Sequence, residues 1–241
     1  MDIIKAKDAQ ELGKKAAELT ANYLNDAINK KGQARLLLAT GKSQLTTLQE
    51  LLKQKVEWKH VEVFHLDEYI GLTREHAASF QKYIAERFVD KLELKKAHYI
   101  SGDEDAEKTI KNLTNEIRTS PVDVALVGIG ENSHIAFNDP PADFQTKEAF
   151  IRVKLDEVAR EQQVKEGWFS SINDVPTEAI TMTVYQIMQS EKIISCVPYK
   201  SKAKAVKRTL ESDLTNEIPA TILKRHNNWS LFLDEDSSSL L

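Results

Sequence analysis

Short apolar runs alternate with longer amphipathic segments along this 241-residue chain. Residues 9–31 carry apolar side chains at helical spacing, and Gly32 follows at a position where a glycine commonly ends a helix. The apolar run 35–39 comes next, and a second helical pattern begins directly after it, near Ser43. Because each helix returns the chain to the same end of the sheet, strands that alternate with helices pair in parallel. The pattern predicts an α/β fold with a mostly parallel, Rossmann-like sheet and helices on both faces.

The same alternation continues to the end of the chain and predicts the remaining elements. We expect further strands at residues 61–66, 122–127, 150–154, 192–197 and 229–233. We expect further helices at residues 77–91, 104–118 and 201–210, with another from residue 157 and a short one after Pro219. No linker or repeat interrupts them, and a single α/β domain commonly reaches this length. Residues 1–241 are therefore expected to form one domain.

Charge and composition exclude several classes of protein. A formal net charge of −4 gives no general attraction to nucleic acid or to an anionic membrane. The first residues lack the apolar core of a signal peptide, and no run approaches the ~18 apolar residues of a membrane span. We therefore expect a cytoplasmic protein that binds neither nucleic acid nor membrane. The single cysteine, Cys196, lies in an apolar run and is interpreted as a buried structural thiol.

Ligands of open α/β sheets bind beyond the carboxyl ends of the strands, so the segments after the strands are candidates for chemistry. The first of them is residues 39–44, Ala-Thr-Gly-Lys-Ser-Gln. Gly41 allows the backbone to approach a ligand, and the helix start that follows offers free N–H groups to an anion. Ser43 is equally consistent with a simple helix N-cap. A nucleotide-binding Walker A loop is excluded, because Leu36 stands where that loop requires its first glycine.

The second segment places Asp67 and Glu68 directly after an apolar strand. A carboxylate in a partly desolvated pocket has a raised pKa, which suits it to act as a general base near neutral pH. Either residue could instead cap the segment that follows. His65 precedes the turn and is interpreted as a packed, hydrogen-bonded histidine.

The third segment, residues 128–141, begins with paired glycines that allow close approach of a substrate. His134 follows, with Asn132 and Asp139 on either side of it. Such neighbours can orient an imidazole through one ring nitrogen while the other acts as acid or base. No metal is expected, because the histidines at positions 60, 76, 98 and 226 form no zinc-binding spacing.

Together and in this order, the three segments resemble the glucosamine-6-phosphate deaminase/isomerase family, whose wider group also contains 6-phosphogluconolactonases. The runs DEYIGL at 67–72 and GIGENSHIAFN at 128–138 carry the resemblance, which extends over essentially the whole chain. It implies a cofactor-free enzyme that converts a hexosamine 6-phosphate, with a glucosamine or galactosamine ring, to the ketohexose 6-phosphate and ammonia. A small sugar phosphate is then the expected partner, and a homo-oligomer is compatible with the sequence.

The resemblance also implies roles for single residues. Asp67 matches the general base that moves a proton between C2 and C1, and His134 matches the histidine that assists opening of the sugar ring. Asp139 stands at the position, usually a glutamate, that holds this histidine. The residues expected to bind the phosphate are Gly41, Lys42, Ser43, Gln44 and Lys202, with Lys200 as the alternative to Lys202.

Two positions depart from the family pattern. Asn132 replaces an aspartate two residues before the histidine. An amide can accept a hydrogen bond from the imidazole, but it cannot stabilise an imidazolium by charge. The lid segment at 156–169 has no clear match for the phosphate-binding arginine of the family, and Arg160 is the candidate. These departures leave open whether the substrate is the glucosamine or the galactosamine epimer.

Two other functions remain as alternatives. A 6-phosphogluconolactonase would use the same histidine to activate water, but lactonases usually have a threonine-alanine-serine-leucine type of run after it. Here that run is Ile-Ala-Phe-Asn at 135–138. A non-catalytic sugar-phosphate sensor would be consistent with Asn132, but such regulators carry a DNA-binding helix-turn-helix, for which no residues are left.

Overall fold

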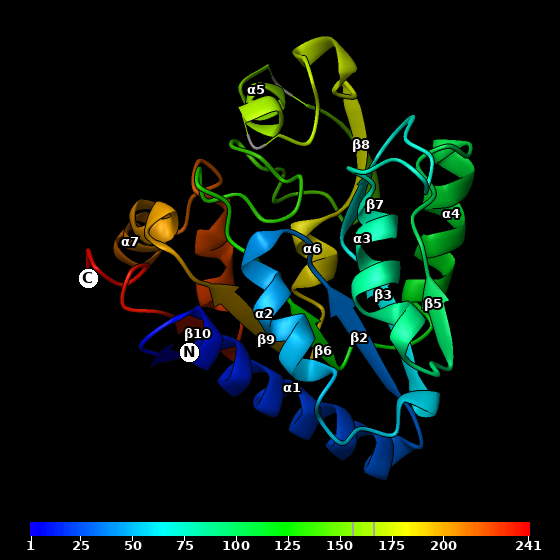
Figure 1. Ribbon diagram of the computed structural model, residues 1–241, viewed down its shortest axis with the longest axis vertical. Helices are drawn as coiled ribbons and strands as arrows, with labels where there is room; N and C mark the ends of the chain where they lie inside the picture. Colours follow the sequence, from blue (N-terminus) through cyan, green and yellow to red (C-terminus); the bar gives the residue numbers. More distant parts are fainter. Residues whose placement is uncertain (156, 166) are drawn as a thin grey trace.

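The computed structural model describes residues 1–155, 157–165 and 167–241, and within them a seven-stranded sheet in the order β1-β10-β9-β6-β2-β3-β5 (Figure 1). Every neighbouring pair in this sheet is parallel. Its strands are β1 (Asp2–Lys5), β2 (Ala34–Leu38), β3 (Val61–His65), β5 (Lys96–His98), β6 (Val124–Leu126), β9 (Lys192–Val197) and β10 (Trp229–Leu233). The predicted mostly parallel sheet is confirmed.

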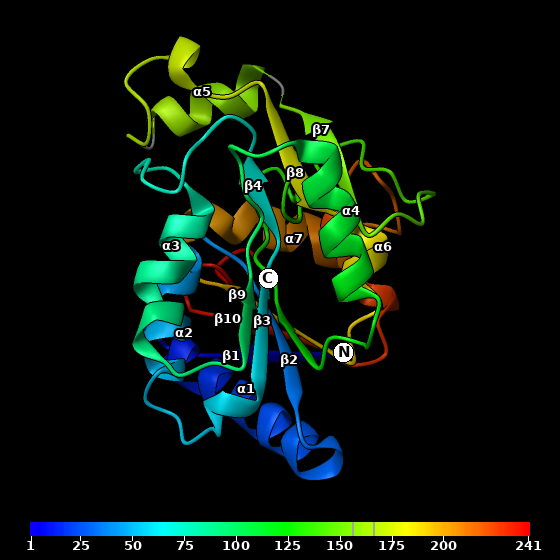
Figure 2. The ribbon, with the colours of Figure 1, turned by 90° about the vertical axis from the view of Figure 1, so that its right-hand side faces the viewer.

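Helices cover both faces of the sheet, also as predicted (Figures 1 and 2). Leu36 and Leu38 face one side of β2 and Leu37 faces the other, because successive side chains of a strand point to opposite faces. The helices of the first side are α1 (Ala9–Lys31), α2 (Lys42–Leu51) and α3 (Phe80–Arg87). Those of the second side are α4 (Ala106–Ile117), α6 (Val184–Ile187), α7 (Ala203–Glu211) and the 3-10 helix η5 (Pro219–Arg225).

Local sequence signals set the two ends of α1. The Asp8 side chain accepts a hydrogen bond of 2.8 Å from the backbone N–H of Glu11, which caps the first turn. Gly32 has a φ of 75° and donates its N–H to the Ile28 carbonyl at 2.8 Å. Since only glycine adopts this left-handed conformation without strain, the helix ends there. The helix predicted at residues 9–31 is confirmed.

A second, three-stranded sheet is the main feature that the sequence pattern does not predict. β4 (Asp67–Tyr69), β8 (Glu178–Met182) and β7 (Phe150–Lys154) form it in the order β4-β8-β7, and both pairs are antiparallel. The strand predicted at 150–154 therefore lies outside the parallel sheet. β4 has three residues, which is too short to show a period of two in the sequence.

The helix predicted at residues 77–91 is shorter in the structure. The Ser79 hydroxyl accepts a hydrogen bond from the N–H of Lys82 at 3.1 Å, so α3 begins at Phe80. Phe88 leaves the helical conformation, and the 3-10 helix η2 (Val89–Lys91) follows it. The serine cap and the departure at Phe88 together shorten the expected element at both ends.

Two buried residues are as the sequence suggests. Cys196 is completely buried on β9, and burial raises the pKa of its thiol to about 12, so the thiol is structural. His65 accepts a hydrogen bond of 2.9 Å at Nε2 from the N–H of Ile100, and burial lowers its pKa to about 4.

Among the described residues, no helix has both the length and the apolar character needed to span a membrane.

Candidate active site

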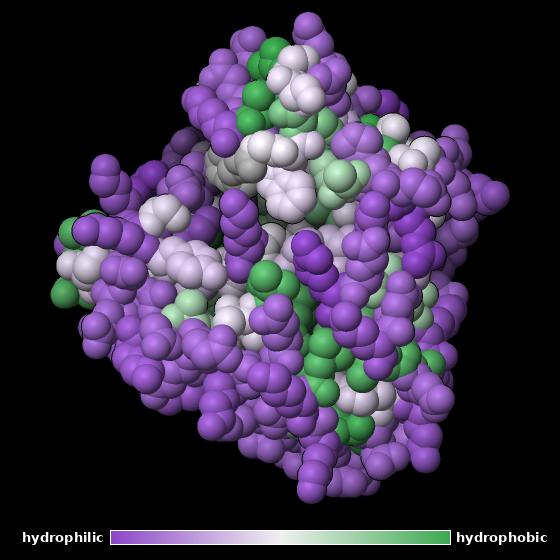
Figure 3. Space-filling model, in the orientation of Figure 1, coloured by the Kyte–Doolittle hydropathy of each residue, from purple (hydrophilic) through white to green (hydrophobic). Residues whose placement is uncertain are grey.

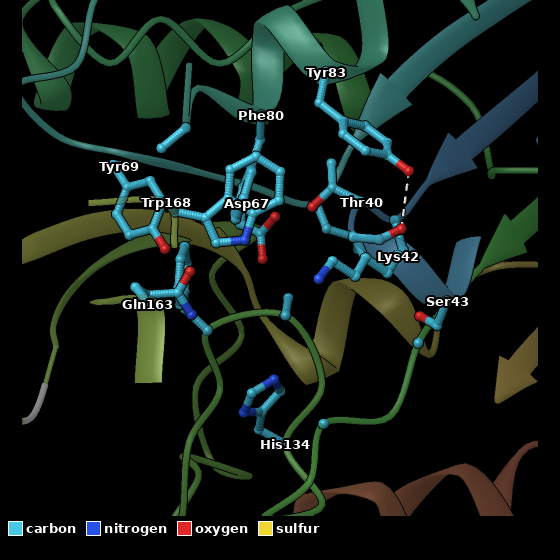
Figure 4. Close-up of a pocket in the computed structure, with 18 of the residues that line it drawn as sticks. Thr40, Lys42, Ser43, Asp67, Tyr69, Phe80, Tyr83, His134, Gln163 and Trp168 are labelled. Carbon is cyan, nitrogen blue, oxygen red and sulfur yellow. Dashed lines mark hydrogen bonds between the residues drawn. The ribbon is translucent and has the colours of Figure 1, made fainter. Parts of the chain in front are cut away.

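A cavity of about 630 Å³ opens at the carboxyl ends of the parallel strands (Figure 4). The segments that follow β2, β3, β6 and β9 line it, together with α3 and residues from the α5 segment (Glu157–Lys165) and its continuation. β2 and β6 are neighbours at the point where the strand order reverses, so the segments after them diverge and leave a crevice. Figure 3 shows the hollow on this face, rimmed largely by hydrophilic side chains.

Asp67 lies at the start of β4 and faces the cavity (Figure 4). Only 6% of this residue is exposed. Burial raises the pKa of Asp67 from its usual 3.8 to about 8, and the negative charges of Glu68 and Asp139 add to the effect. A carboxyl group with such a pKa exchanges its proton close to neutral pH, which suits it to general acid–base chemistry.

Glu68 is turned away from the cavity, as expected for the neighbour of Asp67 on a strand. Its carboxylate accepts hydrogen bonds of 2.8 Å from the backbone N–H of Tyr69, the hydroxyl of Ser79 and the N–H of Gln81. Burial raises the pKa of Glu68, and these hydrogen bonds partly oppose the increase. Glu68 thus takes the capping position that the sequence left open for either carboxylate, and it fixes the start of α3 beside the cavity.

His134 faces the same space as Asp67 from the opposite side (Figure 4). Its Nδ1 lies 2.9 Å from Oδ1 of Asp139, so we place the ring proton on Nδ1, where the carboxylate accepts it. Nε2 is then the nitrogen that can take up or release a proton. Burial alone would raise the pKa of Asp139, but the hydrogen bond and charge of His134, with a hydrogen bond from Asn132, hold it below its usual value.

The ring of His134 packs directly on Gly130. A Cβ atom at Gly130 would lie 2.2 Å from Nε2 of the imidazole, far inside van der Waals contact. The second glycine of the paired glycines is therefore required for the position of the histidine.

Asn132 does not contact the imidazole, contrary to the expectation from the sequence. Its Oδ1 accepts a hydrogen bond of 3.0 Å from the backbone N–H of His134, and its Nδ2 donates one of 3.0 Å to Oδ1 of Asp139. The tight turn between the two residues, where Ser133 has a φ of 72°, places the amide next to the backbone of His134. Asn132 therefore holds the Asp139 carboxylate, and Asp139 in turn orients the ring.

The loop from Thr40 to Ser43 lines one end of the cavity at the start of α2. Gly41 has a φ of 95° and is the N-cap residue, so Ser43 does not serve as the cap. The first N–H groups of a helix have no partner within the helix and attract an anion. Lys42 and Ser43, whose N–H groups are among these, both line the cavity (Figure 4).

Gln44, expected on the phosphate-binding loop, turns away from the cavity. Its side-chain amide donates hydrogen bonds of 3.0 Å to the Ser43 hydroxyl and to the Cys196 carbonyl, and the residue is 1% exposed. It does not line the cavity. The third residue of the helix points toward β9 here, so the Gln44 side chain anchors the loop to the sheet.

The two expected cations differ in position. Lys202 lines the cavity from η4 (Lys200–Lys202), directly after β9. Arg160 lies on α5, and its guanidinium donates hydrogen bonds to the carbonyls of Ile172 at 2.6 Å and Val175 at 3.0 Å. These bonds tie the α5 segment together, and the structure does not bring Arg160 to the cavity. Two other residues of the expected lid segment, Asp156 and Glu166, lie outside the described residues.

Several side chains line the cavity although no motif marks them in the sequence. Phe80, Tyr83 and Arg87 project from one side of α3, at the i, i+3 and i+7 spacing of a helix face. Gln163 and Trp168 reach the cavity from the α5 segment and its continuation (Figure 4). The spacing on α3 is visible in the sequence, but a helix face that packs in the core has the same spacing.

Within the described parts of the chain, no group of three or more His, Cys, Asp or Glu side chains is arranged to hold a metal ion. What the cavity offers is a carboxyl group with a raised pKa, a histidine paired with a carboxylate, and a helix start with a lysine nearby. The first two can move protons on a bound molecule, and the third can hold an anionic group of the same molecule.

Comparisons with known proteins agree with this arrangement. Residues 7–232 match the family described as glucosamine-6-phosphate isomerases/6-phosphogluconolactonase. The chain is 37% identical over 205 residues to a glucosamine-6-phosphate deaminase of Exiguobacterium sibiricum, with 85% of this chain and 80% of the relative covered. It is 35% identical to the glucosamine-6-phosphate deaminase of Bacillus pumilus, with both chains fully covered.

Solved structures show the same fold. A monomeric glucosamine-6-phosphate deaminase of the NagB superfamily superposes with a TM-score of 0.90 at 29% identity, with both chains covered completely. A 6-phosphogluconolactonase from Shewanella baltica superposes with a TM-score of 0.81 at 17% identity, with 97% of each chain covered. At that identity the second similarity concerns the fold alone.

Proposed function

This chain belongs to the family of glucosamine-6-phosphate isomerases and 6-phosphogluconolactonases, and within that family we propose that it is a glucosamine-6-phosphate deaminase. It converts glucosamine 6-phosphate and water to fructose 6-phosphate and ammonia. The two bacterial deaminases named above are 35 and 37% identical to it and the deaminase of known structure is 29% identical, whereas the lactonase is 17% identical.

One observation carries the proposal: Asp67 and the His134–Asp139 pair face each other across a single cavity (Figure 4). Opening a sugar ring needs a group that moves protons between two oxygens. Converting an aldose to a ketose needs a second group that moves a proton between adjacent carbons. The site has one candidate for each task, on opposite walls.

His134 performs the first step. Nε2 removes the proton of the C1 hydroxyl and delivers a proton to the ring oxygen as the C1–O5 bond breaks, which leaves an aldehyde at C1. Asp139 accepts a hydrogen bond from the Nδ1–H throughout and stabilises the imidazolium that exists between the two proton transfers. Asn132 keeps Asp139 in place for this role.

Asp67 performs the second step in its deprotonated form. The carboxylate removes the proton from C2, and the resulting enol receives that proton at C1. The electron pair of the C2–H bond first forms the C1=C2 bond of this enol, while O1 takes up a proton from solvent. When Asp67 returns its proton to C1, that pair becomes the new C1–H bond, and the lone pair of the amino nitrogen forms the C2=N bond of an iminium ion. Water then adds to C2, ammonia leaves, and the ketone of fructose 6-phosphate remains. The raised pKa of Asp67 suits the step, because the same group must first accept the proton and then return it.

The start of α2 and Lys202 bind the phosphate, which positions C1 and C2 between the two catalytic walls. Holding the reacting carbons against fixed groups accounts for much of the rate enhancement that such a site can provide. Gly41, Lys42 and Ser43 contribute backbone N–H groups to this contact.

The proposal is tested by following ammonia and fructose 6-phosphate release from glucosamine 6-phosphate, with galactosamine 6-phosphate and 6-phosphogluconolactone assayed in parallel. We expect turnover of glucosamine 6-phosphate, and the galactosamine assay decides between the two C4 epimers. Hydrolysis of the lactone without ammonia release from either amino sugar would show a lactonase instead. Binding of the sugar phosphates without any turnover would show a sensor.

A further inference from the structure

Arg87 is a cation of the cavity wall that the mechanism above does not use. It is the last residue of α3, and it lines the cavity. Its guanidinium carbon lies 4.7 Å from the centre of the Tyr83 ring. The Nε–H of Arg87 is buried and has no hydrogen-bond partner among the described residues.

Other arginines removed from solvent in this protein have partners. The Nε–H of Arg35 also has no hydrogen-bond partner among the described residues, but this side chain, 2% exposed, lies 3.3 Å from a carboxylate oxygen of Glu62 and donates to the Ile117 carbonyl at 2.9 Å. Arg160 donates to two carbonyls, as described above. Within the described residues, by contrast, no carboxylate lies within ion-pair distance of Arg87. A buried N–H donor without a partner costs free energy, which an anionic ligand in the cavity would recover.

Tyr83 connects Arg87 to the loop at the start of α2. The phenol of Tyr83 donates a hydrogen bond of 2.8 Å to the carbonyl of Gly41 (Figure 4). The guanidinium of Arg87 lies over the ring of the same tyrosine. Tyr83 therefore links the guanidinium of Arg87 to the loop that precedes the helix start, and both line the same cavity.

We propose that Arg87 binds the phosphate of the substrate together with the start of α2 and Lys202, and that Tyr83 is the residue that positions both Arg87 and the Gly41 loop. This inference rests on the proposed function for the identity of the sugar, but not for the phosphate contact. The planar fork of a guanidinium matches two phosphate oxygens, and an aromatic ring beneath it keeps that fork in one orientation.

The test compares Arg87→Ala with Arg74→Ala as the matched control. Arg74 precedes α3 and is exposed, lies 3.8 Å from Asp90, and does not line the cavity. Binding of inorganic phosphate and of fructose 6-phosphate is measured by calorimetry, and the KM and kcat for glucosamine 6-phosphate are measured separately. Calorimetry needs no turnover, so it tests the phosphate contact even if the proposed reaction is wrong.

We expect Arg87→Ala to weaken binding of fructose 6-phosphate and of inorganic phosphate by about ten- to a hundredfold, the range for a lost hydrogen bond to a charged group. KM should rise by a similar factor with a much smaller change in kcat, and Arg74→Ala should match the wild type. Arg87→Lys, which keeps the charge, should recover part of the affinity. Equal binding by the wild type and Arg87→Ala would overturn the proposal.

Tyr83→Phe separates the positioning role from a general loss of packing. This variant keeps the ring under Arg87 but removes the hydrogen bond to Gly41. We expect phosphate binding to weaken while the melting temperature changes little, because Tyr83 is only partly buried. If Arg87→Ala does not fold, Arg87→Gln and Arg87→Lys serve in its place, and unchanged phosphate binding in both would likewise overturn the proposal.

Discussion

The activity of this protein should rise with pH and level off above about pH 9, because Asp67 must be deprotonated to remove the C2 proton. With a pKa of about 8, roughly a tenth of the Asp67 carboxyls are charged at pH 7 and roughly nine-tenths at pH 9. The value of kcat/KM should therefore increase about tenfold between these two pH values. A carboxyl group at its usual pKa of 3.8 would give a flat profile over the same interval.

Replacing Glu68 by Gln should move this increase to lower pH. After burial, the negative charge of Glu68 makes the largest contribution to the raised pKa of Asp67. The two side chains point to opposite faces of β4, and two charges on the order of 10 Å apart interact by ~1.7 kcal/mol at an effective dielectric constant of about 20. That energy corresponds to a shift of about one pH unit.

The assay is kcat/KM between pH 5.5 and 9.5 at constant ionic strength, corrected for the titration of the substrate phosphate. Glu93→Gln is the matched control, since Glu93 is an exposed carboxylate that does not line the cavity and whose charge is screened by solvent. It should leave the profile unchanged. A wild-type profile that is flat from pH 6 to 9 would refute the assignment of Asp67 as the base. A limb that stays in place in Glu68→Gln would show that the charge of Glu68 does not raise the pKa of Asp67.

Two further substitutions test the same two walls of the site. Asp67→Asn should lower kcat by ~10²–10⁴-fold. Between about pH 4 and 8 the native wild type holds a proton on Asp67 that the unfolded chain has released, so the free energy of unfolding of the wild type falls by up to about 1.4 kcal/mol per pH unit. Asp67→Asn has no such proton and should become more stable relative to the wild type as pH rises. Melting temperatures of the two proteins that fall in parallel would contradict this. Asn132→Asp replaces the amide that donates to Asp139 with a second carboxylate beside the His134–Asp139 pair, so NMR should show a pKa of His134 that is higher than in the wild type, and an unchanged value would mean that this charge does not reach the ring.

The sequence was sufficient to predict the fold class and the chain segments that form the site. Leu36, Leu37 and Leu38 belong to a continuous apolar run, which is typical of a strand that is buried on both faces. Because helices connect such strands, the strands pair in parallel. The carboxyl ends of these strands then meet at one edge. For that reason Asp67 and His134, 67 residues apart in the chain, could be expected in one cavity before any coordinates were known.

Only the tertiary structure decided where the individual side chains point. Asn132 holds Asp139 and not the imidazole, Gln44 anchors its loop to β9, and Arg160 binds carbonyls of its own segment. Arg87 reaches the cavity because Glu68 and Ser79 fix the start of α3, and no periodicity in the sequence distinguishes that helix face from one in the core. The physical reason is one of range: strands, caps and glycine turns depend on neighbouring residues, whereas the direction of a side chain in a site depends on contacts with elements that folding brings from far along the chain.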